Sequence, residues 1–268
     1  MKLKYRRSWF PEDGPLFAVG VSLLKDTAVL TLDTSGAGLH KRGYRKLVGE
    51  APLKETLACA MILISRWNRD RVLIDPFCGT GTIPIEAALI GKNIAPGINR
   101  DFASESWPLI LEVLWKQARE EALDLARPGD ELRILGYDIS EEAISLARYH
   151  ARQAGVDGII HLQRMPVSEL KSRYKYGFII CNPPYGERMG DSRDIEKLYR
   201  QMGEVFGNLD TWSYYILSAN PDFERLFGRR ADKKRKLYNG RIMCNYYQYF
   251  GPPPPKKINS SRLSDAIG

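Results

Sequence analysis

An apolar run that ends in two consecutive prolines constrains the fold of this chain more than any other feature. Residues 178–181 read Phe-Ile-Ile-Cys and are followed by Asn182, Pro183, Pro184 and Tyr185. The run is typical of a buried strand, and two prolines fix φ and remove two backbone donors, so the turn is stiff and presents carbonyl groups. The Asn182 side-chain oxygen and the Pro183 carbonyl are acceptors that suit both N–H groups of an exocyclic amino group. The alternative is an ordinary Asn-Pro turn at a strand end.

A second apolar run, residues 72–75, ends in an acid and a glycine-rich loop. After Asp75 the chain reads Pro-Phe-Cys-Gly-Thr-Gly-Thr, and a helix is expected over residues 83–90. Gly79 and Gly81 allow a ligand to approach closely, and the first helical turn directs unpaired N–H groups toward it. The loop lacks the Lys-Ser/Thr of a P-loop, and Pro84 stands where a dinucleotide motif needs glycine. A carboxylate beside such a loop suits a cationic ligand, and a tight turn without a ligand is the alternative.

A third apolar run, residues 132–138, also ends in an acid. The two oxygens of Asp138 match two vicinal ribose hydroxyls, as in nucleotide-binding α/β sheets. Ser140 begins a helix with Glu141 and Glu142 in its first turn, and Gly155 ends it. Capping of this helix is therefore the alternative role for Asp138.

These motifs, in this order, resemble class I S-adenosylmethionine-dependent methyltransferases. A narrower resemblance, over about residues 8–253, is to the bacterial THUMP-associated RNA methylases, which include enzymes that make N2-methylguanosine in large-subunit ribosomal RNA. It rests on the motifs at residues 40–45, 51–55, 75–82 and 182–188. The resemblance implies an α/β fold with a Rossmann-like, mixed seven-stranded sheet and an N-terminal β-hairpin appendage. Family members normally carry a THUMP region, and this chain is expected to begin at the linker after it.

The resemblance also implies the site. Asn182, Pro183, Pro184 and Tyr185 are expected to act on the amino group, with Tyr185 stacked on the base. S-adenosylmethionine, which leaves as S-adenosylhomocysteine, is the expected cofactor, and no metal is expected. Many class I enzymes recognise adenine through an Asp after the third strand, where this chain has Met165 and Pro166. The expected cofactor-binding residues are Asp75, Phe77, Cys78, Gly79, Thr80, Gly81, Thr82, Asp138, Ile139 and Met165.

The implied function is methylation of guanine N2 in structured RNA, with 23S ribosomal RNA as the expected partner. The Asn-Pro-Pro-Tyr motif also serves adenine-N6 enzymes on DNA and glutamine-N5 enzymes on proteins. A transfer RNA guanine-N2 enzyme and a non-catalytic RNA-binding fragment are further alternatives. The oligomeric state is left open.

The charge distribution also indicates a polyanionic partner. The formal net charge is +8, and the basic residues gather in two runs, each with tyrosines beside it. A solvated charged surface is the alternative for either run, but the combination suits phosphate contacts and base stacking. The expected RNA-binding residues are Lys41, Arg42, Arg45, Lys233, Lys234 and Arg235, with Tyr44, Tyr238, Tyr246 and Tyr247 as stacking residues.

Four cysteines without paired spacing are expected to be free thiols, which indicates a reducing cytoplasm and neither a disulfide framework nor a zinc site. No apolar run approaches the ~20 residues of a membrane span, and no signal peptide is recognised.

The remaining patterns organise the chain. A hairpin is expected over residues 17–33, helices over 52–67 and 195–206, a strand over 212–218, and a second hairpin with an Asn-Gly turn at Asn239-Gly240. The long insertion at 91–128 contains Arg100, Phe102 and Trp107, which are expected near the active-site mouth. The expected division is residues 1–50 as a linker with the hairpin, 51–252 as the methyltransferase domain and 253–268 as a flexible tail.

Overall fold

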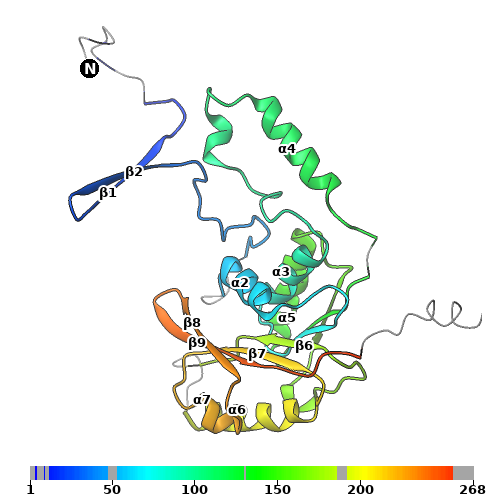
Figure 1. Ribbon diagram of the computed structural model, residues 1–268. Coiled ribbons are helices and arrows are strands. Elements are labelled where there is room, and N and C mark those ends of the chain that lie inside the picture. Colours follow the sequence, from blue (N-terminus) through cyan, green and yellow to red (C-terminus); the bar gives the residue numbers. More distant parts are fainter. Residues whose placement is uncertain are drawn as a thin grey trace, which may run out of the picture. The chain divides into compact units, whose positions relative to one another are not determined.

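A mixed sheet of seven strands organises the larger part of the chain in the computed structural model, which describes residues 4, 9, 12–47, 53–129, 131–185 and 192–255 (Figure 1). Strands β3 to β7 pair in parallel, whereas β9 is antiparallel to both β7 and β8. The expected α/β class and mixed seven-stranded sheet are therefore confirmed. In spatial order the strands are β5 (Ile160–Arg164), β4 (Ile134–Asp138), β3 (Leu73–Asp75), β6 (Phe178–Cys181), β7 (Ser213–Ser218), β9 (Ile242–Tyr249) and β8 (Lys233–Asn239).

Helices cover both faces of this sheet. On one face lie α2 (Glu55–Ser65), α3 (Thr82–Gly91) and α5 (Glu141–Gln153), and on the other lie α6 (Ser192–Gly207) and α7 (Phe223–Phe227) (Figure 1). A short 3-10 helix, η2 (Val167–Glu169), follows β5. Because successive strand residues point to opposite faces, Tyr247 and Tyr249 of β9 pack in the core under α6 and α7, while the Tyr246 hydroxyl donates to the Met61 carbonyl of α2 at 2.9 Å.

The hairpin of β8 and β9 carries the predicted turn one residue further along. Asn239 pairs with Ile242, so Gly240 and Arg241 are the two central residues. Gly240 has φ 65°, and Arg241 is not among the residues with positive φ. A glycine with positive φ at the first central position is typical of a type II′ turn.

Residues 1–46 cluster with residues 92–130 as one compact unit, and residues 47–91 with 131–268 form the other, which contains the sheet. The first unit contains β1 (Ala18–Leu24), β2 (Thr27–Asp33), η1 (Ala103–Ser106) and α4 (Glu112–Asp124). Lys25 and Asp26, with φ 47° and 59°, form a two-residue turn between β1 and β2. Every residue of both strands is exposed. The insertion thus belongs to the same unit as the N-terminal hairpin, and a domain boundary near residue 50 stays a prediction.

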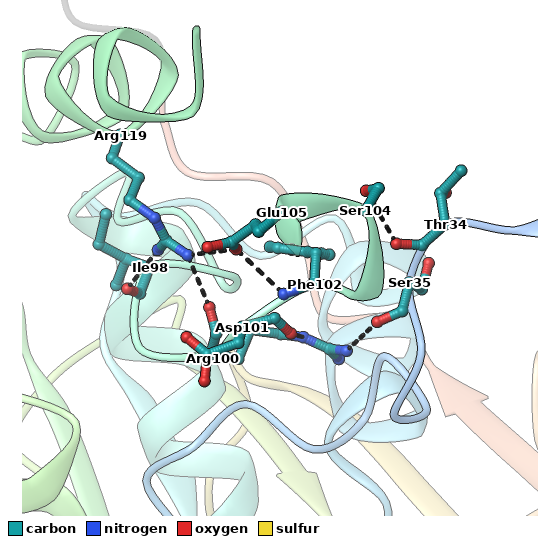
Figure 2. A network of polar contacts seen from close by, with 9 residues as sticks. All are labelled: Thr34, Ser35, Ile98, Arg100, Asp101, Phe102, Ser104, Glu105 and Arg119. Carbon is teal, nitrogen blue, oxygen red and sulfur yellow. Dashed lines mark hydrogen bonds and ion pairs between the residues drawn. The ribbon is translucent and has the colours of Figure 1, made fainter. Parts of the chain in front are cut away.

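Two arginines hold the first unit together (Figure 2). The buried Arg100 donates to the carbonyl oxygens of Ser35 at 3.1 Å, of Gly38 at 3.0 Å and of Ala37. Arg119 of α4 donates to the Ile98 and Arg100 carbonyls at 3.0 and 2.9 Å, and pairs with Glu105 at 2.6 Å. Charged donors on several backbone acceptors join the insertion to the segment after β2.

The insertion side chains that were expected near the active-site mouth have structural partners within this unit. Arg100 also lies 4.9 Å from the centre of the Phe102 ring. The Trp107 indole donates to the Leu16 carbonyl at 3.0 Å and its ring stacks on Phe17 at 4.6 Å. These contacts give all three residues a structural role in the first unit, and their place near the active-site mouth stays a prediction.

Replacing Arg100 by methionine is expected to destabilise the first unit locally. The change leaves the carbonyls of the segment at 35–38 without their buried donor, a loss of about 2–4 kcal/mol. Hydrogen–deuterium exchange should show faster exchange in residues 34–41 and 98–107. Lys116→Met, which removes an exposed i,i+4 pair with Glu120, is the control and should leave exchange unchanged. Equal protection in the two variants would contradict this role for Arg100.

Candidate active site

Three strand ends meet at one cavity of the sheet unit. Asp75 ends β3, Asp138 ends β4 and Asn182 follows β6. These strands are parallel neighbours, so their C-terminal ends lie at the same edge. The sheet order reverses direction at β3, which is where ligands bind in open α/β sheets. All three residues line a cavity of about 450 Å³.

Asp75 is a buried carboxylate that accepts one hydrogen bond from the described residues. It is 1 % exposed, and its Oδ1 accepts the Phe77 N–H at 3.1 Å. Burial raises the pKa of Asp75 well above its ordinary value, the Phe77 N–H partly opposes this, and the nearby charge of Asp138 raises it further. A cationic group beside Asp75 would relieve both the desolvation and the repulsion.

Asp138 braces the glycine loop. Its Oδ2 accepts the Gly79 N–H at 2.9 Å and its Oδ1 accepts the Ser140 N–H at 2.9 Å. The Ser140 hydroxyl oxygen in turn accepts the Ala143 N–H, which caps α5. Asp138 therefore has the bracing role that was left open as the alternative to ribose binding. Each oxygen keeps a lone pair for a further donor.

The loop itself is shaped by two glycines in the left-handed region. Gly79 has φ 52° and Gly81 has φ 87°. A Cβ on Gly81 would stand 3.0 Å from the Ala147 Cβ of α5, so this glycine brings α3 and α5 together. His150 of α5 also contacts the loop, because its Nδ1 lies 3.1 Å from the Thr80 carbonyl while its Nε2 lies 3.2 Å from the Leu47 carbonyl.

Asn182 has an unpaired acceptor at the cavity. Its Oδ1 is buried and has no hydrogen-bond partner among the described residues. Tyr199 of α6 fixes the turn that carries Asn182. Its hydroxyl donates to the Pro184 carbonyl at 3.0 Å and lies 3.0 Å from the hydroxyl of Ser218 at the end of β7. Burial raises the pKa of Tyr199 to about 12, so the hydroxyl keeps the proton that it donates. A rigid turn thus holds an unsatisfied acceptor against the cavity wall.

Tyr185 is buried, at 3 % exposed, and is not among the described residues that line the cavity. Its hydroxyl receives the Asn239 side-chain amide at 2.9 Å and the Cys244 thiol at 3.6 Å, both from the β8–β9 hairpin. The hairpin therefore fixes the end of the Asn-Pro-Pro-Tyr segment, and stacking of Tyr185 on a base stays a prediction.

Most of the expected cofactor-binding residues line the cavity, whereas Gly81 is buried and is not one of the lining residues. Pro184 lines it beside Asn182, while Pro183 is buried outside the lining. Leu198 and Gln201 of α6 were missed by the sequence reasoning, although position 201 lies three residues after an apolar position of an amphipathic helix. The expected lining residues are Asp75, Phe77, Cys78, Gly79, Thr80, Thr82, Asp138, Ile139, Met165 and Asn182; those not expected to bind the cofactor include Leu53, Pro76, Ile83, Val167, Leu198 and Gln201.

Neither Cys78, which lines the cavity, nor Cys181, which ends β6, is activated. Burial raises the pKa of the Cys78 and Cys181 thiols well above the ordinary value, and the Asp75 charge adds to the effect in both. Both stay protonated and are poor nucleophiles. All four cysteines of the chain are free thiols. In the described ranges, no three His, Cys, Asp or Glu side chains form a group that could hold a metal ion.

The basic residues of β8 are exposed, but three of the tyrosines expected to stack on RNA are not. Tyr44 is 2 % exposed, Tyr246 is 0 % and Tyr247 is 2 %, whereas Tyr238 is 64 % exposed. The expectation was wrong for those three, and for Tyr246 and Tyr247 the reason is that both faces of β9 pack against helices. Lys233 and Arg235 make no ion pair with a described residue, whereas Lys234 pairs with Glu224 at 2.7 Å. Lys41, Arg42 and Arg45 belong to the first unit. No helix within the described ranges is long and apolar enough to cross a membrane.

Comparison with curated proteins finds named methyltransferases. The Bacillus subtilis (strain 168) protein named "Putative RNA methyltransferase YpsC" is 49% identical over 249 residues, which cover 93% of this chain and 65% of that protein. The Legionella pneumophila (strain Corby) "Ribosomal RNA large subunit methyltransferase K/L" is 36% identical over 252 residues, which cover 92% of this chain and 36% of that protein. This chain thus spans between about a third and two thirds of the length of these relatives.

Solved structures agree with the fold. "SMU.472, a putative methyltransferase complexed with SAH" has a TM-score of 0.86 and 47% identity, covering 91% of this chain and 64% of that chain. A structure named "predicted N6-adenine-specific DNA methylase" from Listeria monocytogenes str. 4b F2365 has a TM-score of 0.88 and 49% identity, covering 94% and 65%. The RMKL-like methyltransferase domain family matches residues 42–248. This chain belongs to the RMKL-like methyltransferase domain family.

Proposed function

We propose that this chain is an S-adenosylmethionine-dependent methyltransferase that acts on the exocyclic amino group N2 of guanine in structured RNA, with 23S ribosomal RNA as the substrate. The observation that carries the proposal is the buried Oδ1 of Asn182, an acceptor without a partner among the described residues, at a cavity that also holds a buried carboxylate. An unpaired buried acceptor costs about 1–3 kcal/mol, and an amino N–H at that position removes the cost.

The residues of the cavity fit S-adenosylmethionine. Asp75 is a buried carboxylate with a raised pKa, which suits the cationic amino acid end, and Asp138 retains lone pairs for ribose hydroxyls. Phe77, Ile139 and Met165 provide apolar surface for a flat ring. When bound, the cofactor supplies a methyl group on a positively charged sulfur and leaves as S-adenosylhomocysteine.

Asn182 and its turn orient the amino nitrogen. The lone pair of an aromatic amino group is delocalised into the ring, so acceptors that hold its N–H groups favour a geometry in which the lone pair is available. The Asn182 Oδ1 serves one N–H, and the Pro183 carbonyl serves the other. The amino proton becomes acidic only as the new bond forms, so no strong general base is needed beside the nitrogen.

RNA as the substrate is supported by the names of the relatives and by charge. The Bacillus subtilis and Legionella pneumophila relatives are named as RNA and ribosomal RNA methyltransferases. The exposed edge strand β8 presents Lys233, Arg235 and Lys236, which suits a phosphate backbone. Moving a base out of its stack and into such a site costs a few kcal/mol of unstacking free energy. This cost is lowest for bases in loops and bulges.

Asn182→Ala is expected to lower methyl transfer about 100- to 1,000-fold, the usual cost of one preorganised hydrogen-bonding group. The dissociation constant for S-adenosylmethionine should stay within about threefold, because Ala removes no group assigned to the cofactor. Asn182→Asp, which keeps an acceptor oxygen of the same reach, should retain more activity than Ala. The measurement is mass spectrometry of nucleosides from unmodified ribosomal RNA incubated with each protein and the cofactor, with calorimetry for binding.

The product identity decides the substrate. N2-methylguanosine that disappears in Asn182→Ala supports the proposal. N6-methyladenine formed instead in a parallel incubation with DNA would contradict guanine N2 as the acceptor and would favour the reaction that the name of the Listeria structure suggests. Wild-type turnover by Asn182→Ala would overturn the role of the turn.

Asp75→Asn is expected to weaken S-adenosylmethionine binding about 10- to 100-fold through loss of a charged hydrogen-bonding group, while the ligand-free protein becomes more stable at neutral pH. The folded-state pKa of Asp75 is raised above 3.8. Its contribution to stability is therefore complete below pH 3.8 and is lost as the pH rises through the folded pKa. Asn carries no charge to desolvate and still offers Oδ1 to the Phe77 N–H.

Thermal unfolding between about pH 5 and 8, the range in which folded proteins are most stable, measures the stability of the ligand-free proteins. Calorimetric titration measures their affinity for S-adenosylmethionine. The exposed Asp222→Asn is the control, since Asp222 pairs with Arg225 at the surface and should change neither quantity. A less stable Asp75→Asn protein with unaltered cofactor affinity would contradict the assignment.

A further inference from the structure

A second cavity of about 640 Å³ lies at the opposite edge of the sheet unit. Phe178 and Ser213, the first residues of β6 and β7, line it, whereas Asn182 follows the end of β6. Arg66, at the C-terminus of α2, and Gln248 of β9 line it as well. None of these residues has a place in the reaction described above.

The lining is basic. Arg66, Arg71, Lys233 and Arg235 come from the loop region after α2 and from β8, and the described lining contains no acidic residue. Arg71 is partly committed, since its guanidinium donates to the Tyr176 carbonyl at 2.7 Å. Four cations without a carboxylate in the lining favour an anionic ligand.

A buried donor is also unsatisfied here. Gln248 is 3 % exposed, and its Nε2 has no hydrogen-bond partner among the described residues. Gln248 pairs in register with Lys233 of β8 and with Tyr215 of β7. A polar ligand that accepts a hydrogen bond from this donor would remove the cost of leaving it buried and unpaired.

Arg66 has a backbone conformation that an arginine rarely adopts. Its φ of 58° and ψ of 23° are left-handed, at the position after a helix where glycine is preferred. A residue with a side chain is less stable in this conformation than glycine is. The chain thus has a strained arginine at this position, and its long cationic side chain lines the cavity.

Aromatic rings complete the lining. Phe178 and Tyr215 stack on each other with their centres 6.0 Å apart, and Phe250 lies 6.3 Å from Tyr215. Rings, cations and an amide donor together match a nucleotide, which offers a base face, a base edge and a phosphate. A hydrocarbon or a simple anion would use only part of this set.

The edge strand β8 links this cavity to the active site. Lys233 and Arg235 line the cavity, and Asn239 at the other end of the strand donates to the Tyr185 hydroxyl at 2.9 Å. These three residues are separated by even numbers of positions, so their side chains leave the same face of the strand. The strand spans about 20 Å, which a few nucleotides of single-stranded RNA can follow.

We propose that this cavity binds one nucleotide of the RNA strand whose target base enters the cofactor site, and so anchors the RNA at a fixed distance from that base. Arg66, Lys233 and Arg235 contact the phosphates, the rings of Phe178 and Tyr215 meet the base, and Gln248 donates to its edge. The proposal rests on the proposed action on RNA and adds the site that holds the strand.

Binding of a short fluorescein-labelled single-stranded RNA of mixed sequence, followed by anisotropy at several salt concentrations, tests the proposal. Arg66→Gly removes the cation and relieves the backbone, so the fold is retained. It should weaken binding about five- to tenfold and reduce the salt slope by about one. Gln248→Leu should weaken binding by a similar factor without changing the salt slope, because Gln carries no charge.

Arg200→Gln is the matched control. It also removes one positive charge, from an exposed position on α6, which lies on the face of the sheet opposite α2 (Figure 1). It should leave the dissociation constant within about twofold. All variants should bind S-adenosylmethionine as the wild type does, which separates anchoring from damage to the active site.

Several results would overturn the proposal. They are wild-type affinity and salt slope in both cavity variants, an equal loss in Arg200→Gln, and RNA binding too weak to measure in the wild type. Free nucleoside 5′-monophosphates that bind in an Arg66-dependent way, while RNA does not, would make the cavity a small-molecule site instead. Failure of the proposed function appears separately, as a product other than methylated RNA, whereas failure of this anchoring site leaves methyl transfer intact.

Discussion

The protein keeps two polar groups at neighbouring strand ends buried without complete compensation, and the sheet unit is arranged around them. One is the carboxyl group of Asp75, the last residue of β3. The other is the Oδ1 of Asn182, which comes directly after β6, the parallel neighbour of β3. Each costs free energy in the ligand-free protein, Asp75 through its desolvated charge and Asn182 through its unpaired oxygen. A site with this property favours a ligand that brings a cation to one group and an N–H to the other.

The surrounding contacts prevent these groups from relaxing. Asp138 ties the Gly79 backbone to the start of α5, and Tyr199 holds the Pro184 carbonyl from the helix below. Asn239 fixes Tyr185 from the edge hairpin. Because the supports come from α5, α6 and β8, the cavity depends on elements that are far apart in sequence. The same hairpin extends to the second cavity, which makes β8 the structural link between the reacting centre and the inferred nucleotide site.

Local chemistry allowed much of this to be predicted. The strand ends at Asp75, Asp138 and Asn182, the helix cap at Ser140 and the two hairpins follow from apolar runs, capping residues and turn residues. These features depend on neighbours in sequence, so a sequence pattern contains them. The family resemblance then supplied the mixed seven-stranded sheet, whereas the order of its strands is given by the structure.

Contacts between distant segments could not be read in this way. Tyr246 and Tyr247 belong to a strand that is covered on both faces, so tyrosines beside a basic run proved to be core residues. The clustering of residues 92–130 with the N-terminal hairpin depends on Arg100 reaching the carbonyls at 35–38. Gln201 lies at the cavity because α6 crosses it, and the unpaired Gln248 amide is visible only once β7, β8 and β9 are paired.

Proton release on cofactor binding tests the central claim most directly. Calorimetric titration with S-adenosylmethionine, in buffers of different ionisation enthalpy and across the acidic to neutral range, measures the protons that leave the protein. If Asp75 is held partly protonated by burial and must ionise to meet a cation, the wild type releases protons over the range of its raised pKa, and Asp75→Asn releases none there. The same proton balance in the two proteins would contradict the account.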